Sequence, residues 1–228
     1  PTGAGKTLVA EYAIHLAMQR GMRSIYTAPI KALSNQKFRD FRTDPDIGDA
    51  GLMTGDITLN PGGRVMVMTT EILRNTLTED PLRLADVNVV VFDEVHYMDD
   101  PDRGSVWEET LMFLPKDVII VALSATIDNL GQFGAWLERV RDRPVELIAE
   151  TKRPVPLKNF LYHPKAGIFP PSRLKQVRKR FEEHRRNREY KKRDDSELVA
   201  ELFNPNPLPA SCFCLLRRLC VTNACHLV

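Results

Sequence analysis

The sequence predicts an α/β fold in which helices cover both faces of a mostly parallel sheet. Short apolar runs alternate with helical patterns along residues 1–150, as in proteins built on a parallel sheet. Within this alternation, residues 89–92 are apolar without a polar break, which is typical of a strand buried on both faces. The 228 residues carry a formal net charge of +2, and no apolar run approaches the ~20 residues of a membrane-spanning helix. We therefore expect a soluble protein without a membrane partner.

The first predicted helix follows residues 1–7 and carries apolar residues at helical spacing. Gly21 is placed as its C-terminal cap, because glycine adopts the left-handed conformation at little cost. His15 is expected at the surface or half-buried. The predicted buried face of this helix consists of Val9, Tyr12, Ala13, Leu16 and Ala17.

Later patterns continue the alternation of strands and helices. They predict, in chain order, a strand at 24–28, a helix at 33–41, a strand running into a turn at 51–56, a strand at 65–68, a helix at 71–77, the strand at 89–92, a helix at 107–113 and a strand at 118–123. Trp107 and Trp136 are expected in the core. No internal repeat is present.

Residues 1–7, PTGAGKT, match the C-terminal half of the P-loop pattern, whose first residue would precede Pro1. Its glycines let successive backbone N–H groups surround a phosphate, and the following helix adds its N-terminus. A chance match in a flexible loop is the alternative, which the helical pattern after it disfavours. The loop is expected to bind ATP, with Lys6 at the β and γ phosphates and the Thr7 hydroxyl on Mg²⁺. The predicted phosphate-binding residues are Thr2, Gly3, Ala4, Gly5, Lys6 and Thr7.

Asp93 and Glu94 follow the strand at 89–92 directly. Open α/β sheets bind ligands outside the carboxyl ends of their strands, so these acids should face a ligand. Given the phosphate loop, we expect Asp93 to be the second Mg²⁺ ligand and Glu94 to orient or deprotonate the attacking water. An acidic pair that merely ends a strand is the alternative. The pair and the loop favour hydrolysis of a nucleoside triphosphate, with Lys6, Asp93 and Glu94 as its catalytic residues.

Four polar clusters should lie along one edge of the sheet, because each follows a predicted parallel strand. Hydroxyls, helix N-termini and a lysine along one edge suit a phosphodiester backbone. Plain helix capping is the alternative for each cluster, and for residues 69–71 alone it is preferred. The clusters are residues 27–31 (TAPIK), 54–56 (TGD), 69–71 (TTE) and 124–126 (SAT).

Several longer stretches resemble the successive motifs of superfamily 2 DExH-box helicases, above all the superkiller-type RNA helicases that assist the RNA exosome. The resemblance covers about residues 1–160, and HYMDDPDRGSVWEE at 96–109 is peculiar to that group. The stretches are TAPIKALSNQKFRDF (27–41), GLMTGDITLNP (51–61), TTEILRN (69–75), VVFDEVHYMDDPDRGSVWEE (90–109), LSATI (123–127) and RPVPL (153–157).

The resemblance implies a RecA-like P-loop NTPase domain that couples ATP hydrolysis to the unwinding of RNA with a single-stranded 3′ tail. It gives Asp93 to Mg²⁺ and Glu94 to the hydrolytic water. It implies coupling of nucleotide state to RNA by His96, Ser124, Ala125 and Thr126, and an RNA path along Pro29, Lys31, Gly55, Asp56, Thr70 and Glu71. It also implies association with an RNA-degrading or RNA-processing complex.

Three segments are expected: the ATP-binding domain at 1–150, a proline-rich and basic helical linker at 151–207, and the truncated start of a second RecA-like domain at 208–228. LPASCFCLLRRLC at 208–220 carries the last resemblance, with Leu216 where the family usually has serine. We expect a fragment that hydrolyses ATP slowly, because the second domain supplies arginines to the reaction. A catalytically inactive nucleotide-binding scaffold and a DNA helicase of the same superfamily are the alternatives.

The linker contains a predicted basic helix at 172–193, after a proline-rich stretch at 153–156 and a loop at 164–171. Residues 173–193 hold eleven Lys and Arg against three Glu, with Ser172 as a candidate N-cap. Its apolar residues, at helical spacing, are Leu174, Val177 and Phe181. An RNA-contacting helix and a solvated linker helix with its apolar stripe docked on the first domain are equally supported.

All the cysteines lie near the end of the chain, at 212, 214, 220 and 225. Their spacing fits no usual zinc pattern, so buried strand cysteines are favoured and no structural metal is expected. The absence of cysteine pairs from the body of the fold indicates a reducing, intracellular compartment, without specifying cytoplasm, nucleus or organelle.

Overall fold

The computed structural model describes residues 4–101, 103–125, 127, 129–163 and 166–182, in two compact units, Pro1–Pro156 and Leu157–Val228. The first unit contains a six-stranded sheet in the order β3-β2-β4-β1-β5-β6, and every neighbouring pair except β2–β3 is parallel. The predicted mostly parallel sheet is confirmed. Its strands are β1 (Arg23–Ala28), β2 (Ala50–Met53), β3 (Thr58–Leu59), β4 (Val65–Thr69), β5 (Val87–Phe92) and β6 (Ile119–Ala122).

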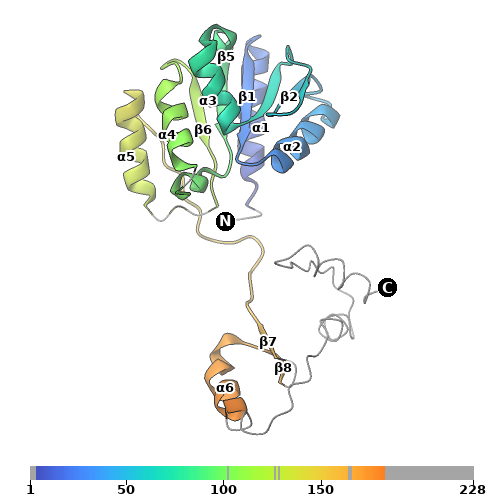
Figure 1. The fold of residues 1–228 in the computed structure, drawn as a ribbon, viewed down its shortest axis with the longest axis vertical. Coiled ribbons are helices and arrows are strands. Elements are labelled where there is room, and N and C mark those ends of the chain that lie inside the picture. Colours follow the sequence, from blue (N-terminus) through green and yellow to red (C-terminus); the bar gives the residue numbers. More distant parts are fainter. Residues whose placement is uncertain (1–3, 102, 126, 128, 164–165, 183–228) are drawn as a thin grey trace. The chain divides into compact units, whose positions relative to one another are not determined.

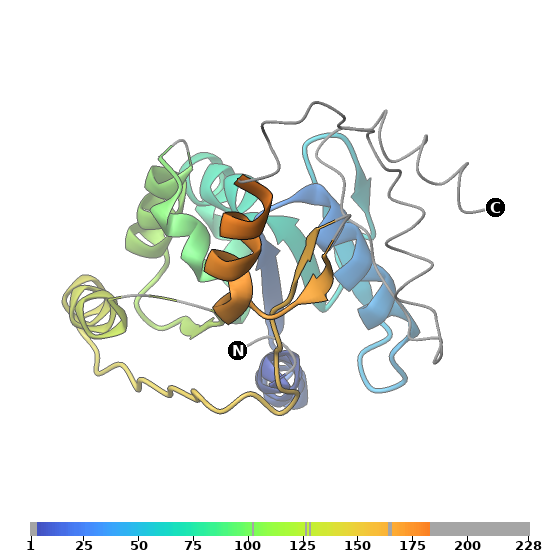
Figure 2. The same cartoon turned by 90° about the horizontal axis from the view of Figure 1, so that it is seen from below.

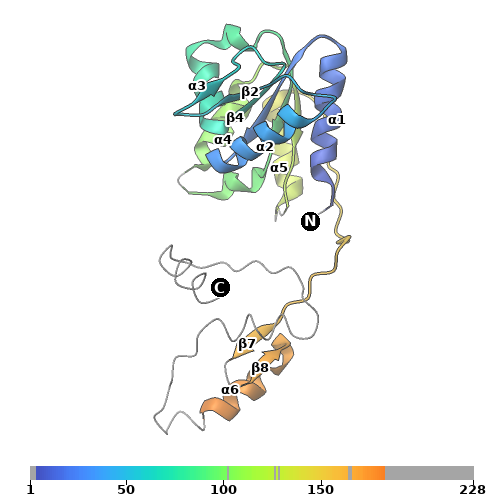
Figure 3. The ribbon, with the colours of Figure 1, turned by 90° about the vertical axis from the view of Figure 1, so that its right-hand side faces the viewer.

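Helices cover both faces of this sheet, as predicted (Figure 2). Helices α1 (Lys6–Gln19) and α2 (Lys31–Thr43) lie on one face, and α3 (Thr70–Glu79) and α4 (Gly104–Phe113) lie on the other. Figure 3 shows α1 and α3 on opposite sides of the sheet. Helix α5 (Leu130–Arg141) joins the α3–α4 face, and short 3₁₀ segments follow α3 and β5, η1 (Pro81–Leu84) and η2 (Val95–Asp99).

Each face has its own apolar core, because successive residues of a strand point to opposite sides. Val90 and Phe92 pack towards α3 and α4, whereas Val89 and Val91 pack towards α1 and α2. All four are buried, which confirms the strand predicted at 89–92. Trp107 is 2% exposed with its ring centroid 5.8 Å from that of Phe92, as expected of a core residue. Trp136 is partly buried and packs against the same core.

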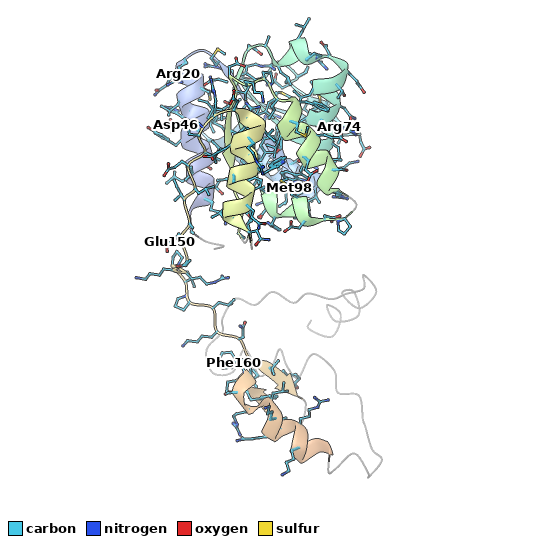
Figure 4. All side chains as sticks on the ribbon, turned by 90° about the vertical axis from the view of Figure 1, so that its left-hand side faces the viewer. Arg20, Asp46, Arg74, Met98, Glu150 and Phe160 are labelled. Carbon is cyan, nitrogen blue, oxygen red and sulfur yellow. The ribbon has the colours of Figure 1, made fainter. Side chains whose placement is uncertain are left out.

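An ion pair joins the two helices that cover one face of the sheet. On the α3–α4 face, Arg74 Nη1 lies 3.2 Å from Glu109 Oε2, which joins the two helices by an ion pair. Arg20, just after the end of α1, lies on the other side of the sheet (Figure 4). The Arg74–Glu109 pair is only partly buried, and pairs near the surface contribute about 0–1 kcal/mol, so apolar burial is the larger stabilising term.

The buried face of α1 differs from the prediction. Ala10, Ile14 and Ala17 are fully buried, whereas Val9 and Tyr12 are 56% and 65% exposed. If the set of buried positions shifts by one residue along the chain, the side of the helix that faces inward rotates by about 100°. The smaller alanines let α1 lie close against the β5 side chains, so packing shape rather than total apolarity selects the face.

The end of α1 confirms the predicted role of Gly21. Its φ is +72°, and its N–H donates to the Met18 carbonyl at 3.0 Å. The Met22 N–H donates to the Ala17 carbonyl, also at 3.0 Å. This pair of bonds is a Schellman motif, which requires a left-handed residue at the position of Gly21.

Several element boundaries differ from the sequence expectation. The helices begin earlier than expected, at Lys31, Thr70 and Gly104, and β6 is shorter than residues 118–123. Strand β3 and helix α5 were not predicted. Strand β3 has only two residues, and its pairing with β2, Leu52 opposite Leu59, depends on a turn rather than on an apolar run.

The second unit begins with an antiparallel hairpin of β7 (Leu161–His163) and β8 (Gly167–Phe169). The prediction of a loop at 164–171 is therefore wrong at residues 167–169, which form β8. This strand begins at Gly167, whose φ is +66°. Ser172 lies inside the 3₁₀ segment η3 (Pro171–Arg173), so it is not the N-cap of α6 (Leu174–Glu182). The rest of the basic segment, residues 183–228 and all the cysteines lie outside the described residues.

Among the described residues, the helices are all too short or too polar to cross a membrane.

Candidate functional site

The predicted site residues follow five parallel strands, so they lie along one edge of the sheet. Neighbouring strands in the order β2-β4-β1-β5-β6 end at residues 53, 69, 28, 92 and 122. The four polar clusters and the acidic pair lie at these ends or directly after them. Helix α1 starts at the same edge (Figure 1). The topology therefore places the clusters side by side, as predicted.

The phosphate loop enters α1 through a left-handed glycine. Gly5 has φ +76° and ψ 20°, and its carbonyl accepts the Leu8 N–H at 3.0 Å. A side chain at Gly5 would meet no atom within 4 Å, so the backbone conformation, not crowding, requires glycine there. Lys6 and Thr7 form the first turn of α1, and the backbone N–H groups of a helix N-terminus favour an anion. Thr2 and Gly3 lie outside the described residues.

Asp93 is held by hydrogen bonds to both of its carboxylate oxygens. The Tyr26 hydroxyl donates to Oδ2 at 2.5 Å, and the Glu94 N–H donates to Oδ1 at 3.0 Å. The Asp93 N–H donates to the Thr27 carbonyl at 3.0 Å, which continues the ladder between β5 and β1. Carboxylate oxygens have about four lone-pair sites in all, so this arrangement leaves sites for a hard cation such as Mg²⁺.

Tyr26 is a site residue that sequence reasoning missed. It is fully buried in β1, and its burial, together with the nearby Asp93 carboxylate, raises the pKa of the Tyr26 hydroxyl well above its ordinary value. The hydroxyl therefore remains a proton donor to Asp93. The available signal was a tyrosine within a buried strand, because a buried phenol needs a hydrogen-bond partner.

Glu94 combines backbone strain with an incompletely bonded carboxylate. Its φ of +58° and ψ of +46° are left-handed, which costs a non-glycine residue about 1 kcal/mol or more. Glu94 Oε2 is buried and has no hydrogen bond among the described residues, although His96 Nδ1 lies 3.3 Å away. Such an oxygen can accept a proton from water.

Hydrogen bonds tie the loop after β6 to the acidic loop after β5. The Leu123 N–H donates to the Phe92 carbonyl at 2.8 Å, and the Val95 N–H donates to the Leu123 carbonyl at 3.0 Å. Ser124 Oγ then lies 3.5 Å from His96 Nδ1. The predicted coupling residues His96, Ser124 and Ala125 are therefore brought together, and Thr126 lies outside the described residues.

Helix α4 supports the acidic loop through a close backbone contact. A Cβ on Gly104 would lie 2.3 Å from the Met98 carbonyl oxygen, so only glycine allows η2 to rest there. The Gly104 N–H donates to the Asp100 carbonyl at 2.8 Å. This contact fixes η2, which contains His96, and gives a physical reason for the glycine in DRGSVWEE.

The predicted nucleic-acid residues divide into exposed and buried groups. Lys31 and Asp56 form an exposed ion pair, and Gly55 lies against the Lys31 side chain. The Pro29 carbonyl accepts a hydrogen bond from Arg103 Nη1 at 3.2 Å. The sequence interpretation did not single out Arg103.

The cluster at 69–71 behaves differently from the exposed pair. Thr69 occupies the N-cap position of α3, but its side chain makes no capping hydrogen bond, so the capping alternative is not supported. Thr70 is 1% exposed, and its hydroxyl has no hydrogen-bond partner among the described residues. Glu71 is partly exposed in the first turn of α3. Of this cluster, Glu71 is the side chain that a ligand can reach.

A cavity of about 720 Å³ lies beside β6 in the first unit. Its lining includes Gly5, Lys6 and Ser124, which places the phosphate loop beside the loop after β6. The rest of the lining comes mainly from β6, α5 and residues 143–150, and the cavity as a whole is lined more by apolar than by polar surface. The part at Gly5, Lys6 and Ser124 belongs to the candidate site.

Two curated relatives named after helicases are about half identical to this chain in sequence. "Antiviral helicase SKI2" of Saccharomyces cerevisiae is 51% identical over 156 residues, covering 68% of this chain and 12% of the relative. "ATP-dependent RNA helicase mtr4" of Schizosaccharomyces pombe is 48% identical over 161 residues, covering 71% and 14%. "Superkiller complex protein 2" of Mus musculus is similar, at 52% identity over 161 residues, 71% of this chain and 13% of that protein. The chain thus spans less than a sixth of these relatives.

Solved structures and a family model agree with the fold. The Mycobacterium smegmatis helicase Lhr, bound to single-stranded DNA and AMP-PNP, has a TM-score of 0.50 and 26% identity over 60% of this chain and 22% of its own. The helicase MrfA, bound to DNA and AMPPNP, has a TM-score of 0.54 at 19% identity, covering 66% of this chain and 24% of its own, and supports the fold alone. The family model of the DEAD/DEAH box helicase matches residues 1–133, so the chain belongs to that family.

Proposed function

We propose that this chain is the ATP-binding part of an ATP-dependent RNA helicase motor. The observation that carries the proposal is the hydrogen-bonded acidic pair after β5, on the same sheet edge as the phosphate loop and bonded through its backbone to the loop after β6. RNA is preferred to DNA because relatives at about half identity include a named RNA helicase, whereas the DNA-bound neighbours are more distant.

In this proposal the loop at residues 2–7 binds the ATP phosphates, with Lys6 at the β and γ phosphates. Thr7 and Asp93 would hold Mg²⁺, which supplies charge neutralisation on the phosphates when bound. The two hydrogen bonds to Asp93 support that role, because they orient oxygen ligands while leaving lone pairs for the ion.

Glu94 would orient the attacking water and accept its proton. Its buried Oε2, lacking a hydrogen bond among the described residues, supports this role. The hydrogen bonds joining residues 92, 95 and 123 would transmit a change at Glu94 to the Ser124 loop. His96, Ser124, Ala125 and Thr126 would then relay nucleotide state to the nucleic-acid edge.

RNA would lie along the loops after β1, β2 and β4, as a single-stranded 3′ tail bound through its backbone. The exposed Lys31–Asp56 pair supports this path, since an RNA phosphate could compete with Asp56 for the lysine. The other proposed contacts are Pro29, Gly55 and Glu71, whereas the side chain of Thr70, which the resemblance also implied, is too buried for RNA to reach. The name of the mouse relative supports membership of a complex. We propose that this complex processes or degrades RNA.

We propose three segments: an ATP-binding domain at 1–150, a linker at 151–207 and the start of a second RecA-like domain at 208–228. The arginines of that second domain contribute about 10³-fold or more to hydrolysis in related reactions. In isolation from such arginines, residues 1–150 should therefore bind ATP weakly and hydrolyse it slowly.

The test compares ATP hydrolysis by the full-length protein in the presence of single-stranded RNA and of DNA of the same sequence. We expect RNA to stimulate turnover more strongly, and a duplex with a 3′ RNA tail to be unwound faster than one with a 5′ tail. Stimulation by DNA alone would favour the DNA helicase, and nucleotide binding without any hydrolysis would favour the inactive scaffold.

A further inference from the structure

Core packing explains the ring of Tyr26 in β1 but not its hydroxyl. The ring is fully buried and meets the Phe41 ring edge-on, with centroids 5.3 Å apart. A phenylalanine would fill the same space. The hydroxyl instead reaches across to the residue that follows the neighbouring strand, where it donates to Asp93 Oδ2 at 2.5 Å.

This bond completes a rigid frame around the Asp93 carboxylate. Tyr26 pairs with Val91 in the register of β1 and β5, so the phenol is fixed by the sheet itself. The second oxygen accepts the N–H of Glu94, whose backbone is left-handed. With one donor on each oxygen, rotation of the carboxylate about its last bond is restricted before any ligand arrives.

A fixed carboxylate matters most for a metal that it holds. Hydrogen bonds from outer residues orient metal ligands, and removing such a partner commonly costs 10–100-fold in metal affinity or activity. The Tyr26 hydroxyl is such an outer hydrogen-bond partner, because it donates to Asp93. Tyr12, in α1, is instead 65% exposed. The two tyrosines therefore provide a matched pair for the same chemical change.

We propose that Tyr26 is a positioning residue whose hydroxyl fixes the Asp93 carboxylate in the orientation that holds the Mg²⁺ of bound ATP. This inference rests on the proposed metal role of Asp93. It concerns the orientation of a ligand, so it predicts a change in metal dependence rather than a general loss of nucleotide binding.

The experiment measures binding of a fluorescent, non-hydrolysable ATP analogue to the full-length protein as Mg²⁺ is titrated. In Tyr26→Phe, the Mg²⁺ concentration for half-maximal binding should rise about tenfold. Binding in EDTA should stay at the wild-type level. Tyr12→Phe should match wild type in both conditions, and thermal melts of each variant establish that the protein is folded.

Asp93→Asn separates the two proposals. It should raise the Mg²⁺ requirement itself, and adding Tyr26→Phe to it should have no further effect, because the hydroxyl acts through the carboxylate. A wild-type Mg²⁺ requirement in Tyr26→Phe, with a raised one in Asp93→Asn, would overturn the role of Tyr26 alone. An unchanged requirement in Asp93→Asn would overturn the metal role as well. Equal loss of binding by Tyr26→Phe with and without Mg²⁺ would make Tyr26 a purely structural residue.

Discussion

Arg141 and Glu94 both place charged atoms in buried surroundings, but their partners differ completely. Arg141, at the end of α5, is 4% exposed and donates to the carbonyls of Leu114 at 2.6 Å, Pro115 at 2.6 Å and Val118 at 3.0 Å. Burial, followed by the nearby Arg143, lowers the pKa of the Arg141 guanidinium from its ordinary value.

Glu94 lacks the complete hydrogen bonding of Arg141. It sits in a strained backbone conformation, and its buried Oε2 has no hydrogen bond among the described residues. A fully bonded buried charge such as Arg141 stabilises the fold, whereas an incompletely bonded one on a strained backbone agrees with the chemical role proposed for Glu94. For these two residues, the difference lies in the completeness of their hydrogen bonding rather than in burial alone.

The largest expected effect is on hydrolysis in Glu94→Gln. Losing a proton acceptor should slow ATP turnover by about 10²–10⁴-fold, equivalent to roughly 3–5 kcal/mol in the activation barrier. The melting temperature should change little, because Glu94 carries no structural bond comparable with those of Arg141. RNA-stimulated turnover of the full-length protein measures this, with Glu108→Gln, an exposed residue of α4, as the control. Equal turnover in Glu94→Gln and wild type would exclude the water-activating role.

Arg141→Met should show the reverse pattern. Removing the guanidinium takes one donor from each of three carbonyls, of which that of Pro115 keeps the Val118 N–H at 3.2 Å. We expect a loss of about 3 kcal/mol in stability. Turnover per folded molecule should be retained well below the melting temperature. Denaturant unfolding provides the measurement, with Arg139→Met, on the exposed side of α5, as its control. Unchanged stability would show that the carbonyls find other partners.

Gly104→Ala should affect both properties, because this glycine lies between fold and site. The added Cβ would meet the Met98 carbonyl at 2.3 Å, so η2 must shift, at a cost of about 1–3 kcal/mol. Turnover should fall too, since η2 carries His96. Gly131→Ala is the matched control: it is also helical, its added Cβ meets no atom within 4 Å, and its stability should be equal or higher. Wild-type stability and turnover in Gly104→Ala would mean that η2 does not depend on this contact.

The smallest stability effect is expected for Lys31→Gln, because the Lys31–Asp56 pair is exposed. Such pairs contribute about 0–1 kcal/mol. The variant should instead weaken RNA binding and reduce the slope of log affinity against log salt by about 0.7. Binding titrations at several salt concentrations measure the slope. Arg20→Gln, beyond the far end of α1 from the phosphate loop, should leave it unchanged. An unaltered slope in Lys31→Gln would remove Lys31 from the RNA path.

Much of this site could be predicted because parallel strands impose a common edge. The apolar run at 89–92 identified a central strand, and the residues after each strand then had to meet. Gly21 was predictable for a similar reason, since few residues accept its left-handed backbone.

The features that were missed depend on partners distant in sequence. The prediction of the inward face of α1 was wrong, because helical spacing does not reveal that small alanines pack best on β5. Tyr26 and Arg141 looked like ordinary strand and helix residues, and their roles appear only with Asp93 or three carbonyls beside them. The two-residue strand β3 has too short a pattern to be recognised.

The two edges of the sheet differ in how they are covered, and the difference affects how the chain behaves in solution. The β2 margin is covered by antiparallel β3, whereas β6 has β5 as its single strand neighbour among the described residues. Ile119 is 42% exposed on β6, and Ile148 across the apolar cavity is 86% exposed. The peptide groups of an edge strand, next to exposed apolar side chains, are a template for the addition of another strand. The 228-residue polypeptide should therefore be prone to self-association in concentrated solution through the β6 margin.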